Sequence, residues 1–242
     1  MKINNSTELI SIIIPVYNHA HTIKSCVDLI LKQTYRPIEI IIVNDGSTDG
    51  YDDVINDVVY SIEKEKVSHK VIDQENQGAP TARNRGFDES KGRYVIFWDA
   101  DTVAKKNMLE VMHKNLIENP QVSFAYSGFR FGFKKFKCLS YDKEKLKKFN
   151  YIDVTSLLRR EDFPRFDESL KKFQDWDLWL SIAQKGKTGI CVPKVLYKKI
   201  VKGREGISSW LPRIFYKLPI KNKNLEEYKK AKEIIYKKHQ II

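Results

Sequence analysis

The chain has 242 residues, of which 42% are hydrophobic, and a formal net charge of +12. This length suits one α/β domain with an extension, and the apolar content excludes an intrinsically disordered chain. No apolar run reaches the length of a membrane-spanning helix, and the polar segment 1–8 predicts no signal peptide.

Cysteine usage and charge distribution give two further expectations. The three cysteines, Cys26, Cys138 and Cys191, lie far apart and show no metal-binding spacing, so we expect three buried thiols and a cytoplasmic location. Residues 202–242 contain eleven Lys or Arg and four Glu, which is more than half of the excess charge. Such a tail suits an anionic lipid or an acidic substrate, whereas charge alone is too unspecific to predict a nucleic-acid partner.

The first half of the chain alternates apolar runs with amphipathic segments. Residues 9–16 form a nearly continuous apolar run, which is typical of a strand buried on both faces. The same patterns predict strands at 38–43, 69–73 and 94–99, and helices at 23–31, 52–65, 81–90 and 108–116. This order predicts an α/β fold with a mostly parallel central sheet flanked by helices, and ligands bind such sheets at the carboxyl ends of strands.

Two aspartates follow the strand at 94–99. Asp99 and Asp101 flank Ala100, and two carboxylates at the end of a buried strand are costly unless a cation pairs with them. A divalent metal is the expected partner because hard cations take oxygen ligands and bridge to substrate phosphates. Asp45 follows the strand at 38–43 in the same way.

The second half is less regular. Residues 122–133 suggest two short strands around Gly128, and residues 134–150 suggest a basic, irregular flap. Asp175 and Asp177 alternate with large aromatic residues at the start of a helix, and residues 189–200 predict a last strand.

Five segments together resemble the inverting family 2 glycosyltransferases of GT-A fold, over roughly residues 8–205. They occur in the order of that family, at residues 11–18, 39–49, 76–86, 92–101 and 174–180. Any one of them alone is unspecific, but all five in order are strong support.

The resemblance implies a nucleotide-sugar donor, usually a uridine one, and transfer of a hexose to a hydroxyl of a glycan or lipid-linked acceptor. It implies Mn²⁺ or Mg²⁺ held by Asp101 and a catalytic base at Asp175, with Asp177 in support. The implied nucleotide-sugar-binding residues are Pro15, Tyr17, Asn18, Asp45, Arg83, Asp99 and Ala100. Trp176 is expected either to stack on a sugar or to fill the core.

The chain departs from the family pattern at two places. The residue before the base is Gln174 where the family commonly has Glu, which leaves the acceptor-side role of this position open. The loop at 201–208 lacks the histidine that many members place near the metal. Either Lys202 or Arg204 is then expected to bind the diphosphate instead, or metal use is expected to be weaker.

Other interpretations stay open for single residues and for the whole chain. Asp45 and Asp175 could be helix caps, Arg83 could form a surface salt bridge, and the pair at 99–101 could be a structural turn. A nucleotide-sugar-binding module without turnover is the alternative function. A dinucleotide-dependent oxidoreductase is disfavoured because no G-x-G-x-x-G follows Val16.

We expect a glycosyltransferase domain at 1–205, with a nucleotide-binding half at 8–102 and an acceptor half at 103–205, followed by a basic amphipathic extension at 206–242. The apolar residues of segment 210–218, together with Leu225, Tyr228, Ala231 and Ile235, form an imperfect apolar stripe beside lysines. This pattern predicts either an anionic membrane surface as partner, on the inner face, or packing on the domain or on a second subunit in a homo-oligomer.

Overall fold

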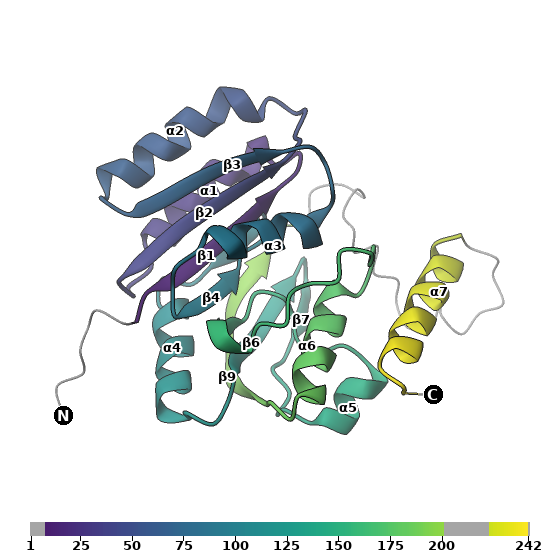
Figure 1. The fold of residues 1–242 in the computed structure, drawn as a ribbon. Coiled ribbons are helices and arrows are strands. Elements are labelled where there is room, and N and C mark those ends of the chain that lie inside the picture. The colour runs from purple at the N-terminus through teal and green to yellow at the C-terminus, as the bar shows by residue number, and fades with distance from the viewer. Residues whose placement is uncertain (1–7, 201–222, 242) are drawn as a thin grey trace.

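A computed structural model describes residues 8–200 and 223–241 of the chain (Figure 1). It is built around one mixed sheet, whose strands lie in the order β3-β2-β1-β4-β8-β6-β9-β5, with β7 paired to β6. The α/β class with flanking helices is therefore confirmed.

The first half of the sheet is parallel, as expected. Its strands are β1 (Ile10–Val16), β2 (Ile38–Asp45), β3 (Ser68–Gln74) and β4 (Tyr94–Phe97). They alternate with α1 (Ala20–Leu31), α2 (Tyr51–Lys64) and α3 (Ala79–Glu89). Side chains of β1 are almost entirely buried because helices cover both faces of the sheet. Gly86 lets α3 approach closely, since a Cβ there would lie 2.4 Å from Cγ2 of Ile13.

The second half of the sheet is mixed. Its elements are β5 (Thr102–Ala104), α4 (Met108–Glu118), β6 (Phe124–Phe131), β7 (Lys134–Phe136), α5 (Lys143–Lys148), β8 (Leu157–Arg159), a 3-10 turn (Arg160–Asp162), α6 (Gln174–Gln184) and β9 (Gly189–Lys199). Strand β8 pairs antiparallel with β4 and β6, whereas β6 and β9 are parallel.

Two apolar cores lie on opposite faces of this sheet. The core beneath α1, α2 and α4 includes Ile12, Ile14 and Met112, and the core beneath α3 and α6 includes Ile13, Phe97 and Trp179. Neighbouring residues of β1 thus point into different cores, as the pleat of a strand requires. The result is three layers, with the carboxyl ends of β1, β2 and β4 free to carry polar residues.

Three expectations from the sequence are wrong in detail. Residues 124–131 form one strand whose register shifts at Gly128, where two strands were expected. Segment 134–150 contains β7 and α5 in place of an irregular flap, and Asp142 caps α5 by accepting a hydrogen bond from Lys145 N. Cys26 is the expected buried thiol, but Cys138 and Cys191 form a disulfide. Cys138 follows β7 and Cys191 lies on β9, and both strands pair with β6.

The C-terminal helix α7 (Lys223–Lys238) packs on the domain (Figure 1). Ile235 is fully buried, and the ring of Tyr228 lies 5.0 Å from that of Phe173. At the end of the helix, Asp177 of α6 accepts hydrogen bonds from Lys238 and contacts buried His239 at 2.7 Å. The stripe through Tyr228 and Ile235 therefore faces protein, which favours the packing interpretation of this segment. Residues 201–222, with Lys202, Arg204 and the part of the predicted stripe at 210–218, lie outside the described residues.

None of the helices within residues 8–200 and 223–241 combines the length and the apolar character that crossing a membrane requires.

Candidate active site

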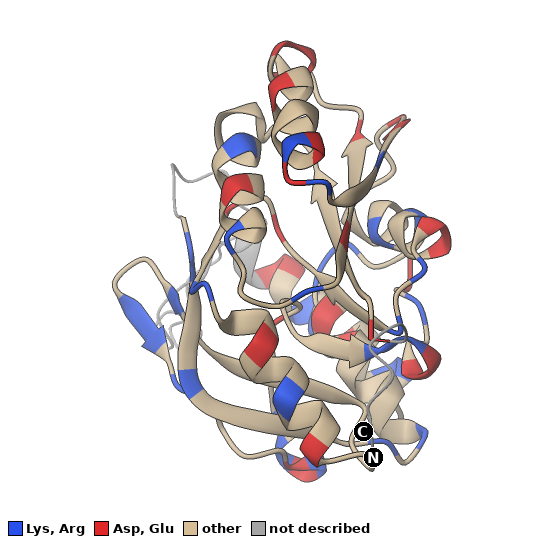
Figure 2. Ribbon diagram, turned by 90° about the vertical axis from the view of Figure 1, so that its left-hand side faces the viewer, with Lys and Arg blue, Asp and Glu red and all other residues tan. Residues whose placement is uncertain are grey.

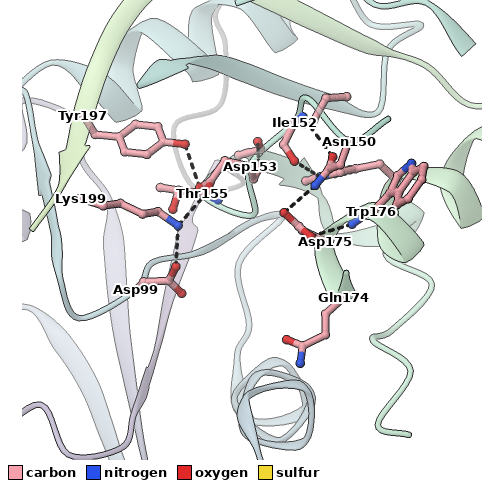
Figure 3. A network of polar contacts seen from close by, with 12 residues as sticks. Asp99, Asn150, Ile152, Asp153, Thr155, Gln174, Asp175, Trp176, Tyr197 and Lys199 are labelled. Atoms are coloured by element: carbon pink, nitrogen blue, oxygen red, sulfur yellow. Dashed lines mark hydrogen bonds and ion pairs between the residues drawn. The ribbon is translucent and has the colours of Figure 1, made fainter. Parts of the chain in front are cut away.

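A partly buried ion cluster forms where β4 and β9 end (Figure 3). Arg83 of α3 donates to Oδ1 of Asp99 at 2.9 Å, and Lys199 of β9 donates to Oδ2 at 2.8 Å. Burial on its own disfavours the charged carboxylate, but Lys199 and Arg83 outweigh it and hold the pKa of Asp99 below its usual range. Asp99 is therefore an ionised acid, and Arg83 is an internal residue with no surface salt bridge.

Lys199 has a second carboxylate partner that the sequence did not indicate. Its ammonium group lies 2.8 Å from Asp153, which also accepts a 2.8 Å hydrogen bond from the Tyr197 hydroxyl (Figure 3). Burial opposes a charged lysine, yet the charges of Asp153 and Asp99 raise the pKa of Lys199. The ammonium group thus stays protonated between two carboxylates.

Asp101 differs from its neighbour because its carboxylate is not neutralised. Its Oδ1 atom is buried and has no hydrogen-bond partner within the described part of the chain. Burial, and then the charge of Asp99, raise the pKa of Asp101 to about 6. A buried oxygen with unused lone pairs is the donor that a hard divalent cation requires, so the residue type and its surroundings fit a metal ligand.

Protein ligands for a metal are few, however. Within residues 8–200 and 223–241, no three His, Cys, Asp or Glu side chains are grouped closely enough to hold a metal ion. Magnesium-type sites often use one or two carboxylates and complete their coordination with substrate phosphates and water. The site therefore fits a metal that is held together with a diphosphate and not by the protein alone.

Asp175 lies in the first turn of α6, opposite the ion cluster (Figure 3). Its Oδ2 accepts a 2.8 Å hydrogen bond from the Asn150 amide, and its Oδ1 accepts the backbone N–H of Trp176 at 2.9 Å. Burial and the charge of Asp153 raise its pKa to about 6, although both hydrogen bonds oppose the shift. The N-cap position is Phe173, so Asp175 is not the cap of the helix.

Gln174 connects the start of α6, next to Asp175, to the ion cluster. Its Oε1 accepts a 3.1 Å hydrogen bond from Arg83, and its Nε2 donates to the carbonyl oxygen of Leu170. The amide therefore orients the arginine without adding a charge. Trp176 is buried, and its indole N–H donates to the carbonyl of Leu146, so this side chain fills the core and is not free to stack on a sugar.

Asp45 lies at the end of β2 and is buried. Its Oδ1 accepts hydrogen bonds from the Gln74 side chain and the Gln77 N–H, and its Oδ2 accepts the Gly78 N–H at 2.8 Å. The helix cap interpretation is wrong, because Gly50 occupies the N-cap of α2. The carboxylate holds the loop between β3 and α3 against the end of β2.

The end of β1 meets the same loop region. Asn18, with a φ of 55°, accepts a hydrogen bond from Thr48 N and donates its own N–H to Ser47. Tyr17 is 47% exposed, whereas Ala100 is buried. The carboxyl end of β1, from Pro15 to Asn18, thus lies next to the segment that follows Asp45.

The structure brings Arg83 together with Asp99 and Gln174. Lys199 and Asp153 extend this cluster toward Asp175, whose pKa responds to the charge of Asp153. Sequence reasoning missed Lys199, Asp153 and Asn150. The available signal for Lys199 was its position at the end of the last strand, which pairs with Thr102 beside the aspartates. Asp153 and Asn150 come from a loop with no recognisable motif.

The model of the family described as glycosyl transferase family 2 matches residues 11–167, more than half of the chain. The chain belongs to glycosyl transferase family 2. The family match ends before Asp175 and Lys199, so it does not extend to these two residues.

Two relatives illustrate how this family 2 chain compares with curated proteins. It is 33% identical over 195 residues to the putative teichuronic acid biosynthesis glycosyltransferase TuaG of Bacillus subtilis, covering 76% of this chain and 75% of TuaG. It is 40% identical over 113 residues to glycosyltransferase GlyG of Streptococcus pneumoniae, covering 46% of this chain but only 36% of GlyG. The match therefore spans about a third of GlyG.

Solved structures confirm the GT-A fold of this family 2 chain. Staphylococcus aureus TarS 1–349 in complex with UDP-GlcNAc has a TM-score of 0.68 at 19% identity, covering 87% of this chain and 64% of that one. The mannosyltransferase PcManGT from Pyrobaculum calidifontis, in complex with GDP-Man and Mn²⁺, has a TM-score of 0.64 at 19% identity, covering 81% of this chain and 58% of that one. At such identities the likeness concerns the fold.

Proposed function

We propose that this chain is an inverting glycosyltransferase that moves a sugar, most simply a hexose, from a UDP-sugar to an acceptor hydroxyl. The observation that carries the proposal is the contrast between two carboxylates. Asp99 is neutralised by Arg83 and Lys199, whereas Asp101 keeps a buried oxygen that has no partner among residues 8–200 and 223–241. This arrangement suits a divalent metal and a diphosphate better than a structural turn, in which both carboxylates would be paired.

The metal would be held by Asp101 and is proposed as Mn²⁺ or Mg²⁺. When bound, it would neutralise charge that develops on the nucleoside diphosphate as it leaves. Mn²⁺ in the PcManGT complex supports this choice, and UDP-GlcNAc in the TarS complex supports a uridine donor. The fixed cations Arg83 and Lys199 add positive charge beside the same position.

Asp175 is proposed as the general base. In direct displacement, the acceptor oxygen attacks the anomeric carbon and its proton passes to a carboxylate oxygen of Asp175, while the bond to the diphosphate breaks. Asn150 holds Oδ2 of Asp175 in place, and the N-terminal position in α6 favours the ionised form. A pKa of about 6 makes the carboxylate a stronger base than an exposed aspartate while it stays ionised at neutral pH.

The division of labour between the two halves is also proposed. Residues 8–102 would bind the nucleotide through Pro15, Tyr17, Asn18 and Asp45, with Ala100 lining the donor site beside Asp99. Residues 103–205 would bind the acceptor, and 206–242 would be an extension. Because Asp45 already holds the loop at 74–78, we expect it to shape the base pocket and to bind the uridine with its remaining lone pairs. TuaG, with teichuronic acid in its name, supports a polysaccharide acceptor.

A donor screen that reads nucleoside diphosphate release tests the activity. Release with one UDP-sugar, dependent on Mn²⁺ or Mg²⁺ and lost in Asp175→Asn, is the expected result. UDP with Mn²⁺ should raise the melting temperature, whereas NAD and DNA should not. Stabilisation by a UDP-sugar without turnover on any acceptor would favour the binding-module alternative.

A further inference from the structure

A cavity of about 540 Å³ opens at the edge of the sheet, between β5, β9 and the β6–β7 hairpin. Five exposed cationic side chains line this cavity, which we call the basic cavity. They are Lys105, Arg130, Lys135, Lys194 and Lys198. Its lining contains no Asp or Glu, and none of the five is ion-paired to a carboxylate within residues 8–200 and 223–241. Five unneutralised charges around one hollow attract an anion.

The hairpin beside the basic cavity carries an exposed aromatic residue at its tip. The turn passes through Gly132, at φ +55°, to Phe133, whose side chain is fully exposed at 109%. The hairpin itself is braced, because Phe129 stacks on Phe136 at 4.7 Å and on Tyr197 at 5.4 Å. Figure 2 shows the hairpin at the left of the view with blue Lys and Arg segments on it and on the strand beside it.

We propose that this face docks on a membrane that contains anionic phospholipid, with headgroup phosphates in the basic cavity and Phe133 in the interface. Cations that surround an exposed aromatic group are the combination that holds a peripheral protein on anionic lipid. The described part of α7 is the weaker candidate, because Ile235 is buried and Tyr228 packs on Phe173.

The proposed orientation brings the candidate active site to the lipid surface. Phe131, at the end of β6, is in register with Lys199 of β9, and the hairpin continues beyond this level. Val103, in the cavity wall, follows Asp101 by two residues. A docked hairpin would therefore set the site close to the headgroups, where a lipid-carried acceptor could reach it. Docking itself does not depend on the proposed transferase activity.

Flotation of the full chain with vesicles tests the proposal. We expect flotation with phosphatidylcholine vesicles that contain phosphatidylglycerol, little flotation with phosphatidylcholine alone, and release by salt. The double variant Lys135→Glu/Lys194→Glu should weaken partitioning by about tenfold or more, since each basic residue near an anionic surface contributes roughly fivefold. Phe133→Ser should weaken it while leaving the net charge unchanged.

The matched control is Lys229→Glu/Lys230→Glu, which reverses two exposed lysines on α7. This control should float like the unchanged chain, and all variants should keep the melting temperature. Loss of flotation in the control but not in the hairpin variants would overturn the proposal in favour of the tail. Absence of flotation at low salt would reject a lipid partner. A lipid partner would also be rejected if the hairpin variants changed the oligomeric state of the protein and left flotation unchanged. Inorganic phosphate at millimolar-scale concentration and chloride at the same ionic strength should displace the protein from vesicles equally. This result would support a lipid surface over a free phosphate ligand.

Discussion

Lys199 donates a 2.8 Å hydrogen bond to Asp99, from a position 100 residues further along the chain. Together with the contact from Arg83, it keeps Asp99 ionised and paired. Because Asp99 is compensated from within the protein, the unmatched negative charge of the motif resides on Asp101. The proposed donor site thus contains one carboxylate that is already paired and one that is available to a metal.

Removing the Lys199 charge should destabilise the fold. In Lys199→Met, Asp99 keeps Arg83, but Asp153 loses the ammonium group of Lys199 and retains the hydrogen bonds from Tyr197 and Thr155 N. Breaking one side of a buried ion pair costs about 3–5 kcal/mol. We expect a decrease of this order in the free energy of unfolding, measured by urea denaturation.

Lys198→Met is the matched control, because the neighbouring lysine is exposed and should change stability by less than about 0.5 kcal/mol. Equal stability of the two variants would show that Lys199 is not part of a buried cluster.

Asp175→Asn should separate activity from stability. Turnover should fall by about a hundredfold or more, with donor affinity nearly unchanged, because only the proton acceptor is lost. The folded protein raises the pKa of Asp175 from 3.8 to about 6, so the folded state binds this proton more tightly than the unfolded state. The contribution of Asp175 to stability therefore falls as pH rises from about 4 to about 6, and the uncharged amide should melt at a higher temperature at pH 8.

Asp57→Asn, on the exposed surface of α2, controls for a general effect of removing a negative charge. A variant at Asp175 that retains full turnover would rule out this residue as the base.

Turnover should also depend on pH through the Asn150 contact. The proposed reaction requires ionised Asp175, so kcat should decline as pH falls through about 6. The amide of Asn150 stabilises the ionised form, and Asn150→Ala should therefore move this acid limb to higher pH. The pH profile of kcat, compared with that of Asn115→Ala on α4, checks the shift. An unchanged limb in Asn150→Ala would contradict the orienting role.

Activity should require a divalent cation that Asp101 holds. EDTA should abolish nucleoside diphosphate release, and Mn²⁺ or Mg²⁺ should restore it. In Asp101→Asn, Mn²⁺ should no longer increase the thermal shift produced by UDP, while the shift with UDP alone persists. Full activity of this variant in the presence of chelator would exclude metal-assisted transfer.

The parts of the site that the sequence predicts are those in short local motifs. Asp99 and Asp101 follow an apolar strand, and Arg83 and Asp175 lie in recognisable segments, so residue type and order were enough. Lys199 and Asp153 could not be predicted, because their role depends on which strand ends meet. The pairing of β5 with β9 brings Thr102 beside Lys199, and no local pattern specifies that register.

The same limit applies to the fold. The parallel strands β1 to β4 could be predicted because each is an uninterrupted apolar run next to an amphipathic helix. The Cys138–Cys191 disulfide and the position of α7 could not, since both depend on contacts between distant segments. The sequence of α7 indicated an apolar stripe, but it did not indicate whether lipid or protein covers that stripe.

The pairing of β4 with β8 has a consequence for the order of folding. Strands β1 to β4 can pair once residue 97 has been synthesised, but β4 stays an unpaired edge until residues 157–159 arrive. Asp99 remains without Lys199 for 100 residues of synthesis. The segment at residues 8–102 can thus form early on the ribosome, with Asp99 already paired to Arg83, whereas the exposed edge of β4 makes it a state that chaperones would recognise.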